Sequence, residues 1–545
     1  MGCQSNTAAG AVASGTIAKV ELAVALALTL FAVLLHITFF HHAGALWRDE
    51  ISSVNLVNLG SLAEVVQQNH LDSFPVAWPV LLWTWVGVGL GENDLALRGL
   101  GLCIGLGVLG ALWCCARRFD VRAPMLSLLL FALNPTLFVY GDSLRGYGLG
   151  TMMLLFALAA MWGLVEASTT RSIVCAGLIA IVAVQCMFPN AGMLLAISIG
   201  ASVVCFRRGD MRAALAVLCI GICALVSLLP YLNTIAKHRA WTALVQVPLD
   251  LARMGTKFAE ALGSARPSMI WIAGILFVFG VCVCFSRRWR DTRAVKDGVL
   301  LYLGAAAVAA LVLHAVYLLT LSVTTHPWYF LAPMGVVAVA IDAAVFAFVS
   351  DNRAARWVRV AGVVCVAAWV APNLWSKAHT RMTNLDDVAR ELERGAAKDD
   401  LVVLTSWYAG VTVERYYRGA APWVSVPDFE ERHFQPYAAF KDKLSEPEPM
   451  KPVLDRISDT LRTGHNVWIV GGLPLLRPEE APGELPPPPH PAVGWNESSY
   501  TRVWLRQVSR LLLSKAKGVQ QVPLPTRAVV SEFESLPLTR IWGWR

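Results

Sequence analysis

Long apolar runs separated by short polar stretches fill the first 375 residues of this chain. A helix of about 20 apolar residues is long enough to cross a lipid bilayer. We therefore predict a polytopic α-helical membrane protein with about eleven spans. The runs lie at about residues 20–41, 97–116, 124–140, 147–166, 172–187, 191–206, 213–232, 269–286, 298–322, 329–349 and 358–374.

The charges between these runs predict which side each loop faces. With the N-terminus inside, five basic loops fall on one side, as the positive-inside rule requires. This holds only if the run at 74–90 does not cross. That run is short and contains Pro75, Pro79 and three tryptophans, which favour the membrane interface. We predict a helix in the outer leaflet; if it crosses, every later loop changes side. The basic loop residues are Arg117, Arg118, Arg122, Arg171, Arg207, Arg208, Arg212, Arg287, Arg288, Arg290, Arg293, Lys296, Arg353, Arg356 and Arg359.

The composition changes after about residue 375, where charges become frequent and apolar runs short. The pattern predicts helices at 383–394, 411–417, 453–461 and 498–514, and buried strands at 401–404 and 467–470. We expect a transmembrane domain over 1–375, with a first outer loop at 42–96 that carries interfacial helices. A second domain over 376–545 is expected to be a small α/β sandwich on the outer side. No catalytic pattern is evident in it.

Overall composition supports the membrane assignment. Hydrophobic residues make up 56% of the chain and charged residues 15%, against about 25% in soluble domains. The net charge of +8 does not indicate nucleic-acid binding, because the basic residues sit in short loops between spans. The first run lacks a small-residue cleavage site, so no cleavable signal peptide is expected. The 12 cysteines lack paired spacing in polar loops, which predicts neither a disulfide framework nor a zinc site.

Adjacent carboxylates follow the first span, in the sequence Trp47-Arg48-Asp49-Glu50. Acids at a membrane surface are costly to desolvate, and one reason to keep them is base catalysis. Asp49 is alternatively an N-cap for a helix starting near Ile51. Glu50 is alternatively a substrate-orienting group, a cation ligand or a charge at the helix N-terminus. Ser61 and Glu64 fit a capping box, so Glu64 is expected to cap a helix.

Several motifs together resemble the C-type (GT-C) membrane glycosyltransferases, in particular the bacterial relatives of protein O-mannosyltransferases and the lipid A aminoarabinose transferase. Trp-x-Asp-Glu ends the first span, Leu97-Arg98-Gly99-Leu100 opens another, and Asn134-Pro135 is followed by Tyr140-x-Asp142 and Arg145-Gly146-Tyr147. The resemblance covers about residues 20–345. Two positions depart from the family: Ser73-Phe74-Pro75 replaces His-Pro-Pro, and Pro327-Trp328-Tyr329 replaces Pro-Arg-Tyr, so one family arginine is missing.

The resemblance implies an inverting transfer of a hexosyl or pentosyl group from a polyprenyl-phosphate donor. The acceptor is a glycan, lipid or protein on the outer side. By resemblance, Asp49 is the catalytic base, Glu50 the second acid, and Arg145 with Tyr147 binds substrate. Further candidates for substrate binding are Asp142, His70, Lys237, Arg239, His326 and Tyr329.

Each candidate has a structural alternative. The alternative for Arg145 is an interfacial anchor or a partner of Asp142. The alternative for Arg98 is a side chain that snorkels to the membrane surface. The alternative for Lys237 and Arg239 is that they lie at the solvated end of a span. The alternative for His70 and His326 is a structural role as hydrogen-bonded groups. Trp47 is expected to anchor in the membrane.

The cofactor, location and competing functions follow from the same features. No cofactor is certain, and a divalent cation such as Mg or Mn is left open. A composition rich in Ala, Val and Arg is typical of a bacterial protein. We therefore expect the chain in the inner membrane, with its C-terminal domain in the periplasm. The rival functions are a transporter or flippase of a lipid-linked substrate and a membrane-anchored scaffold. A transporter needs polar groups in mid-span and often repeats, and few such groups are present.

Overall fold

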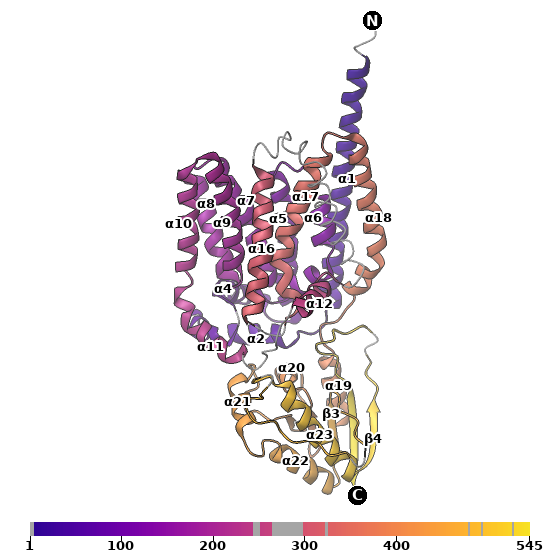
Figure 1. The fold of residues 1–545 in the computed structure, drawn as a ribbon. Helices are drawn as coiled ribbons and strands as arrows, with labels where there is room; N and C mark the ends of the chain where they lie inside the picture. Colours follow the sequence, from indigo (N-terminus) through magenta and orange to yellow (C-terminus); the bar gives the residue numbers. More distant parts are fainter. Residues whose placement is uncertain are drawn as a thin grey trace.

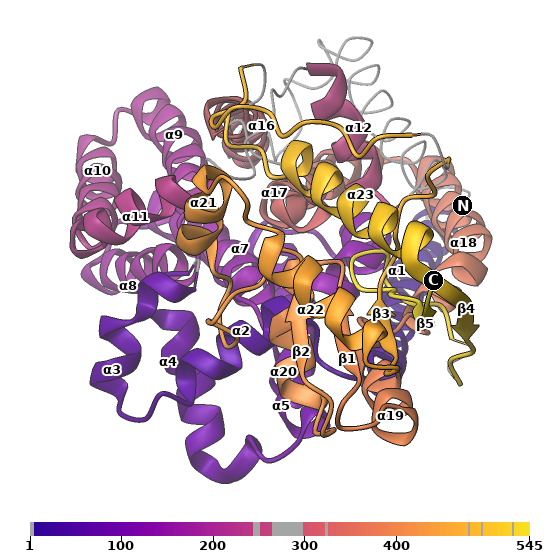
Figure 2. The same cartoon turned by 90° about the horizontal axis from the view of Figure 1, so that it is seen from below.

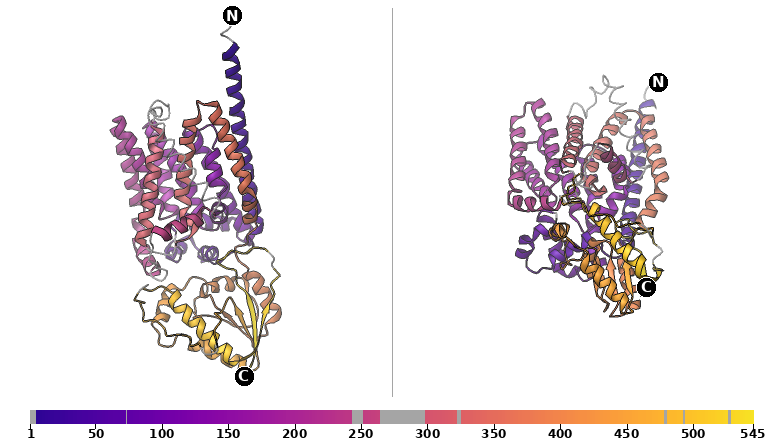
Figure 3. Two further views of the ribbon diagram at one scale, coloured as in Figure 1. Left: turned by 45° about the vertical axis from the view of Figure 1, so that its right-hand side comes forward. Right: turned by 60° about the horizontal axis from the view of Figure 1, so that its bottom comes forward.

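The chain forms a bundle of long helices with a smaller α/β domain at one end (Figure 1). The structure is a computed structural model and describes residues 5–72, 74–242, 251–263, 298–321, 325–477, 480–491, 494–525 and 528–545. Residues 42–96, called here the first outer loop, lie between the bundle and the α/β domain, and the chain ends within that domain (Figures 1 and 3). The end of the bundle next to this loop is called the outer end, and the opposite one the inner end. The apolar part of the chain therefore forms one body, and the C-terminal domain is attached at its outer-loop end.

Eight segments among the described residues are long and apolar enough to cross a membrane. The polytopic helical fold predicted from the apolar runs is therefore confirmed. The predicted run at 172–187 forms the shorter helix α8, and the run at 269–286 lies outside the described residues. The bundle helices are α1 (Ser5–His42), α5 (Asp94–Arg118), α7 (Gly146–Glu166), α8 (Thr170–Cys186), α9 (Asn190–Arg208), α10 (Met211–Val226), α16 (Val299–Leu321), α17 (Leu331–Val349) and α18 (Arg353–Ala378).

The predicted span at 124–140 is not one straight helix. It is broken into α6 (Met125–Ser127), η3 (Leu128–Ala132) and η4 (Leu137–Gly141). The break falls at Asn134-Pro135, where proline has no backbone N–H and disfavours a helical residue before it. The Asn134 side chain accepts a hydrogen bond from the Thr136 amide at 2.8 Å and so satisfies one group that the break frees. This break gives η4 its own direction toward the outer end.

The first outer loop contains the short helices that the sequence predicts: α2 (Arg48–Val57), α3 (Leu62–Gln67), η1 (Asn69–Leu71), α4 (Ala77–Trp85) and η2 (Val86–Leu90). Helices α2, α3 and α4 lie side by side when the molecule is viewed from the α/β domain (Figure 2). Ser61 and Glu64 form the predicted capping box. The segment Ala77–Leu90 is among the shorter apolar helices of 10–17 residues and bends at Gly89, whose φ is 88°. Its length agrees with a helix that does not cross.

The helix ends that carry basic residues meet at the opposite end of the bundle. Arg118 at the end of α5 lies 2.6 Å from Glu166 at the end of α7. Arg208 at the end of α9 donates to the carbonyl of Val165 at 3.0 Å. The start of α18 is bound to Glu21 of α1 through Arg356. These contacts agree with the predicted grouping of the basic loops on one side.

The C-terminal domain is built on a five-stranded sheet in the order β2-β1-β3-β5-β4. Strands β1, β2 and β3 are parallel, and β5 pairs antiparallel with β3 and β4. Residues of β1 alternate between two cores, because Leu401 and Val403 face one set of helices and Val402 and Leu404 face the other. The α/β sandwich predicted from the sequence is confirmed. Its elements are α19 (Leu385–Gly395), β1 (Leu401–Leu404), η7 (Trp407–Ala409), α20 (Gly410–Tyr416), β2 (Trp423–Ser425), α21 (Tyr437–Ser445), α22 (Lys451–Arg462), β3 (Val467–Val470), α23 (Ser498–Lys515), β4 (Ala516–Val522) and β5 (Leu538–Trp544).

Candidate active site

Asp49 lies in the first turn of α2, at the outer end of the bundle. The helix begins after Trp47, whose backbone N–H donates to the Glu50 carboxylate at 3.2 Å. Glu50 therefore caps the helix, and the alternative role of Asp49 as an N-cap is wrong. The Asp49 side chain keeps 24% of its surface exposed and lies 3.5 Å from the Arg48 guanidinium. A carboxylate that is partly exposed can be reached by a hydroxyl and take its proton.

Glu50 is held from several directions and is fully buried. The guanidinium of Arg98 donates to both of its oxygens, at 3.0 and 2.9 Å. The amide of Leu144 donates to it at 3.1 Å. A carboxylate with all these donors has its lone pairs occupied. We therefore propose that Glu50 positions the loop, in place of the predicted contact with substrate.

Arg98 does not snorkel to the membrane surface, because its side chain is 3% exposed. Besides Glu50, it binds the carbonyl of Gly44 at 3.0 Å through Nε and that of Ala45 at 2.8 Å. A planar guanidinium suits such a fork of acceptors. Arg98 thus ties the start of α5 to the backbone just before Asp49.

Arg145 is paired with Asp72, which the sequence analysis did not single out. The guanidinium lies 2.5 Å from the Asp72 carboxylate and 3.0 Å from the Ser53 hydroxyl. It also donates to the backbone carbonyl of Asp49 at 3.0 Å and lies over the Phe74 ring at 4.5 Å. Burial opposes its charge, but Asp72 and the groups around it keep the pKa of Arg145 above the usual value. Both alternatives for Arg145, an exposed anchor and a pair with Asp142, are wrong.

Asp142 pairs instead with His36 of α1, at 2.6 Å, and is buried. Burial raises the pKa of Asp142 to about 6, against the opposing effect of His36. An added Cβ at Gly105 would lie 2.1 Å from the Asp142 carboxylate, so glycine is required for this close packing. The pair joins α1 to the η4–α7 loop, and we propose a structural role for Asp142.

Aromatic side chains surround Asp49 on the side of the bundle. Its carboxylate interacts electrostatically with Tyr147, His326 and Tyr329. His326 stacks on Trp328 with ring centroids 4.4 Å apart. Burial lowers the pKa of His326 to about 4, with Asp49 opposing, so this imidazole is neutral near pH 7. Three predicted substrate-binding residues are thus brought to Asp49.

Trp47 belongs to the same aromatic group. It is fully buried, with ring centroids 5.7 Å from Trp328 and 6.0 Å from Phe533. The expected role as a membrane anchor is wrong, since a fully buried ring cannot face lipid. Its indole joins the first loop to the loop before α17 and to the C-terminal domain.

The C-terminal domain supplies further neighbours that the sequence analysis missed. Arg48 contacts Glu534 at 3.5 Å and lies over the Tyr408 ring at 4.3 Å. Although burial opposes its charge, Asp49 and Glu534 raise the pKa of Arg48. Burial, followed by the charge of Asp49, raises the pKa of Tyr437. No local motif marks these residues, because the fold alone brings them to the first loop.

The remaining candidates lie apart from this group or outside the description. His70, in η1, is partly buried, and burial together with Lys237 lowers its pKa. Lys237 is exposed on α11 (Leu232–Thr242), which packs on η1. The side chain of Arg239 lies outside the described residues. The structure thus joins Lys237 to His70 and does not join either to Asp49 by a described contact.

The donors near Asp49 do not fit a divalent cation. Glu50, the second acid that such an ion needs, is bound by Arg98, and Arg48 and Arg145 place positive charge at the same point. Among the described residues, no group of three His, Cys, Asp or Glu side chains is arranged to hold a metal ion.

No family model and no curated protein matches the sequence. Among solved structures, the chain is similar to ArnT from Cupriavidus metallidurans, in the apo state, with a TM-score of 0.49, 13% identity, and coverage of 81% of this chain and 92% of ArnT. ArnT bound to undecaprenyl phosphate gives a TM-score of 0.47 at 13% identity, with 81% and 92% covered. The archaeal oligosaccharyltransferase AglB from Archaeoglobus fulgidus, in complex with an inhibitory peptide and a dolichol-phosphate, gives 0.43 at 12% identity, with 82% and 69% covered.

These neighbours are C-type membrane glycosyltransferases, the same kind of protein that the first-loop motifs resemble.

Proposed function

We propose that this protein is an inverting glycosyltransferase that moves a sugar from a polyprenyl-phosphate donor to a hydroxyl-bearing acceptor, with Asp49 as the base. One observation carries the proposal. Asp49 keeps 24% of its side chain exposed, while the neighbouring acids Glu50 and Asp72 are buried and bound to arginines. Of these three neighbouring acids, Asp49 is the one that a substrate can reach.

The proposed reaction has balanced steps. The Asp49 carboxylate accepts the proton of the acceptor hydroxyl, and the acceptor oxygen attacks the anomeric carbon from the face opposite the phosphate. The bond between that carbon and the phosphate oxygen breaks, and the lipid phosphate leaves with the electron pair. Attack from the opposite face inverts the anomeric carbon. Base catalysis of this kind contributes about 10²–10⁴-fold in rate.

Positive charge near Asp49 supports the departure of a phosphate. Arg48 and Arg145 lie beside the Asp49 carboxylate and its backbone, and Lys257 of α12 (Leu251–Ala261) acts electrostatically on His326. Fixed cations stabilise charge that develops in the transition state. Because Arg145 is already bound to Asp72, we propose that it contributes its charge and holds the loop. Undecaprenyl phosphate, the lipid in one ArnT structure, is the donor carrier class we propose.

The proposed setting is a bacterial plasma membrane, with the first loop and the C-terminal domain in the periplasm. We propose the division into a transmembrane domain over residues 1–375 and an α/β domain over 376–545. The proposal agrees with the position of the α/β domain at the end opposite the basic helix ends (Figure 1).

A transporter is less well supported by the described residues. Three acids buried in the bundle have polar partners: Glu21 binds Arg356, Asp142 binds His36, and Asp342 accepts a hydrogen bond from Ser127 at 3.0 Å. A buried acid that already has a partner is less available to a transported substrate. His314 of α16 is also buried, and no such partner is described for its Nε2.

The test uses purified full-length protein in nanodiscs, with a panel of polyprenyl-phosphate sugars and cell-envelope lipids and glycans as acceptors. Transfer is followed as loss of the donor and release of the lipid phosphate. We expect the Asp49→Asn variant to lose about 10²–10⁴-fold in rate, since an amide cannot take the proton.

The matched control is Asp442→Asn, which changes an exposed aspartate on α21. It should keep full activity, and both variants should unfold at the wild-type temperature. Full transfer by Asp49→Asn contradicts the assignment of the base. Movement of an intact lipid-linked sugar across the membrane, with no release of lipid phosphate, favours the transporter.

A further inference from the structure

Residues 43–50, called here the Asp49 segment, join α1 to α2 and carry the proposed base. The bundle holds this segment from one side. Arg98 binds the carbonyls of Gly44 and Ala45, and its guanidinium fixes Glu50 at the end of the segment. All these contacts come from one arginine at the start of α5.

The C-terminal domain holds the same segment from the other side. The amide of Met382 donates to the Ala43 carbonyl at 2.9 Å. The amide of Leu46 donates to the Tyr416 hydroxyl at 2.7 Å, and the amide of Arg48 donates to the Glu534 carboxylate at 3.1 Å. Three backbone positions of the segment are thus bound by residues that lie more than 300 positions further along the chain.

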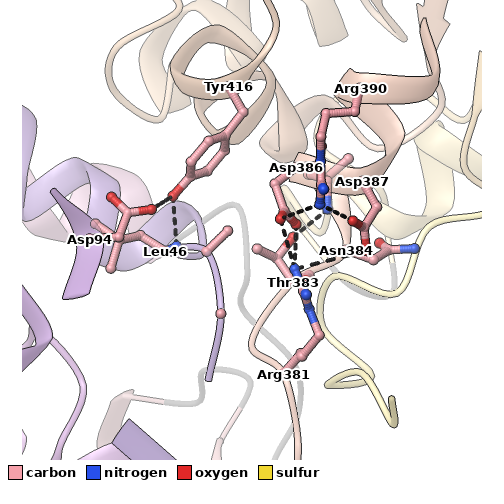
Figure 4. A network of polar contacts seen from close by, with 12 residues as sticks. Leu46, Asp94, Arg381, Thr383, Asn384, Asp386, Asp387, Arg390 and Tyr416 are labelled. Carbon is pink, nitrogen blue, oxygen red and sulfur yellow. Dashed lines mark hydrogen bonds and ion pairs between the residues drawn. The ribbon is translucent and has the colours of Figure 1, made fainter. Parts of the chain in front are cut away.

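Figure 4 shows the two parts of this interface side by side. Tyr416 points from α20 to Leu46 and donates to Asp94 at the start of α5. Arg415 binds the same Asp94 at 2.6 Å. In the second part, Arg381 binds Asp386 at 2.6 Å, and an added Cβ at Gly44 would lie 3.1 Å from its guanidinium. Gly44 also has a φ of 69°, a backbone conformation that favours glycine.

Glu534 is the most enclosed member of this interface. Its side chain is fully buried and also accepts from the Thr412 hydroxyl at 3.3 Å. A buried carboxylate needs partners, and here they are the backbone and guanidinium of Arg48, the residue before Asp49. The domain therefore places a fully buried carboxyl group against the residue that precedes the base.

We propose that the C-terminal domain positions the base, with Tyr416 and Glu534 as positioning residues that act through the Asp49 segment. The proposal rests on the proposed function of Asp49. The domain is then a working part of the active site, because an unheld segment would let the carboxylate move away from the acceptor hydroxyl. A displacement of about 1 Å costs on the order of 10²-fold in rate.

The first experiment measures position without activity. Backbone hydrogen exchange is recorded for peptides that cover residues 43–50 in the wild type and in Tyr416→Phe. Loss of the hydroxyl removes the acceptor of the Leu46 amide, so exchange in this segment should become about tenfold faster or more. The matched control is Tyr500→Phe, a buried tyrosine of α23 that donates to the Pro487 carbonyl at 3.1 Å. Unchanged exchange in Tyr416→Phe overturns the proposal.

The second experiment measures the effect on transfer. Tyr416→Phe and Glu534→Gln should lower kcat by about 10-fold to 100-fold and leave the donor KM within about twofold, since neither residue touches the donor. Tyr500→Phe should lose as much thermal stability as Tyr416→Phe but keep the wild-type kcat and donor KM. A change in donor KM with an unchanged kcat contradicts a positioning role.

A combination of variants separates this proposal from the assignment of the base. If Tyr416 acts through Asp49, Tyr416→Phe has no further effect on the residual rate of Asp49→Asn. An equal fold-loss in both backgrounds means that Tyr416 supports the fold in general, which overturns the inference. Full activity of Asp49→Asn removes the proposed base, and the exchange result then still tells whether the domain holds the segment.

Discussion

The two ends of the helix bundle both bury charged side chains, and they differ in what they leave exposed. At the inner end, Glu21 is fully buried and bound by Arg356 at 3.0 and 2.5 Å and by Arg359 at 3.4 Å. At the outer end, Glu50 is bound by Arg98 in the same bidentate way, but the adjacent Asp49 is 24% exposed. The inner cluster joins helices, whereas the outer cluster holds a loop around an accessible acid.

The difference shows that similar ion pairs can have different roles. A buried pair in which all groups are satisfied is costly to break and does no chemistry. A base must stay in reach of its substrate, so its neighbours have to supply the rigidity. Arg98, Arg145 and the C-terminal domain supply it here. The predictions that follow test this contrast.

The largest effect on stability is expected at the inner end. Arg356→Ala leaves Glu21 buried without its main partner and should cost about 3–5 kcal/mol. Because the cluster is remote from Asp49, kcat per folded molecule should stay within about twofold. Thermal unfolding and transfer assays measure the two quantities. Arg118→Ala, which breaks a pair exposed by 38% and 42%, is the control and should cost at most about 1 kcal/mol. A large loss of kcat in folded Arg356→Ala would remove the contrast between the ends.

An intermediate effect on both quantities is expected at Arg98. Arg98→Gln leaves Glu50 uncompensated and releases Gly44 and Ala45, so stability should fall and kcat should drop about 10-fold to 100-fold. Adding Glu50→Gln removes the unpaired charge. The double variant should regain most of the stability but little of the kcat, because the segment is still not held. Recovery of both together would mean that Arg98 supports the fold alone.

The smallest effect is expected in the pH dependence of stability. Burial raises the pKa of Glu534 to about 7 from an ordinary value of 4.5, against the effect of Arg48. The folded protein therefore holds this proton more tightly than the unfolded chain. Its contribution is fully present below about pH 4.5 and is lost as the pH rises toward 7.

The comparison of wild type with Glu534→Gln isolates this group, since Asp142, whose pKa is also raised, is common to both. Between pH 4.5 and 7, the wild-type melting temperature should fall relative to the variant by the order of a few degrees. Parallel curves across this range would mean that Glu534 titrates elsewhere.

Much of the fold could be predicted because it depends on local patterns. The long apolar runs gave the span positions, and the short, fully apolar segments at 401–404 and 467–470 gave two central strands. Strands β2, β4 and β5 were missed; β2 has three residues, and β4 is mostly exposed and lacks an apolar pattern. The run at 124–140 was predicted as one span although Asn134, Pro135 and Thr136 interrupt its apolar residues, and the helix breaks there.

The candidate site could be predicted only in part. Adjacent acids after a span marked Asp49, and the Arg-x-Tyr sequence marked Arg145. The partners of these residues, Asp72 and Glu534, stand alone in polar stretches and have no motif. Trp47 and Arg98 were expected at the membrane surface, because a sequence does not tell an interfacial residue from one that another domain covers.

The amino-acid sequence by itself determined that this chain has many apolar helices long enough to cross a membrane, carries a C-terminal α/β domain and places two acids behind its first span. These features follow from hydrophobic length and period, which are local properties. Only the tertiary structure decided which of the two acids is accessible. Glu50 is buried because Arg98, 48 residues further on, binds it, and Asp49 is held between the bundle and Glu534, 486 residues past Arg48. Such roles depend on contacts between distant parts of the chain, which a local pattern does not contain.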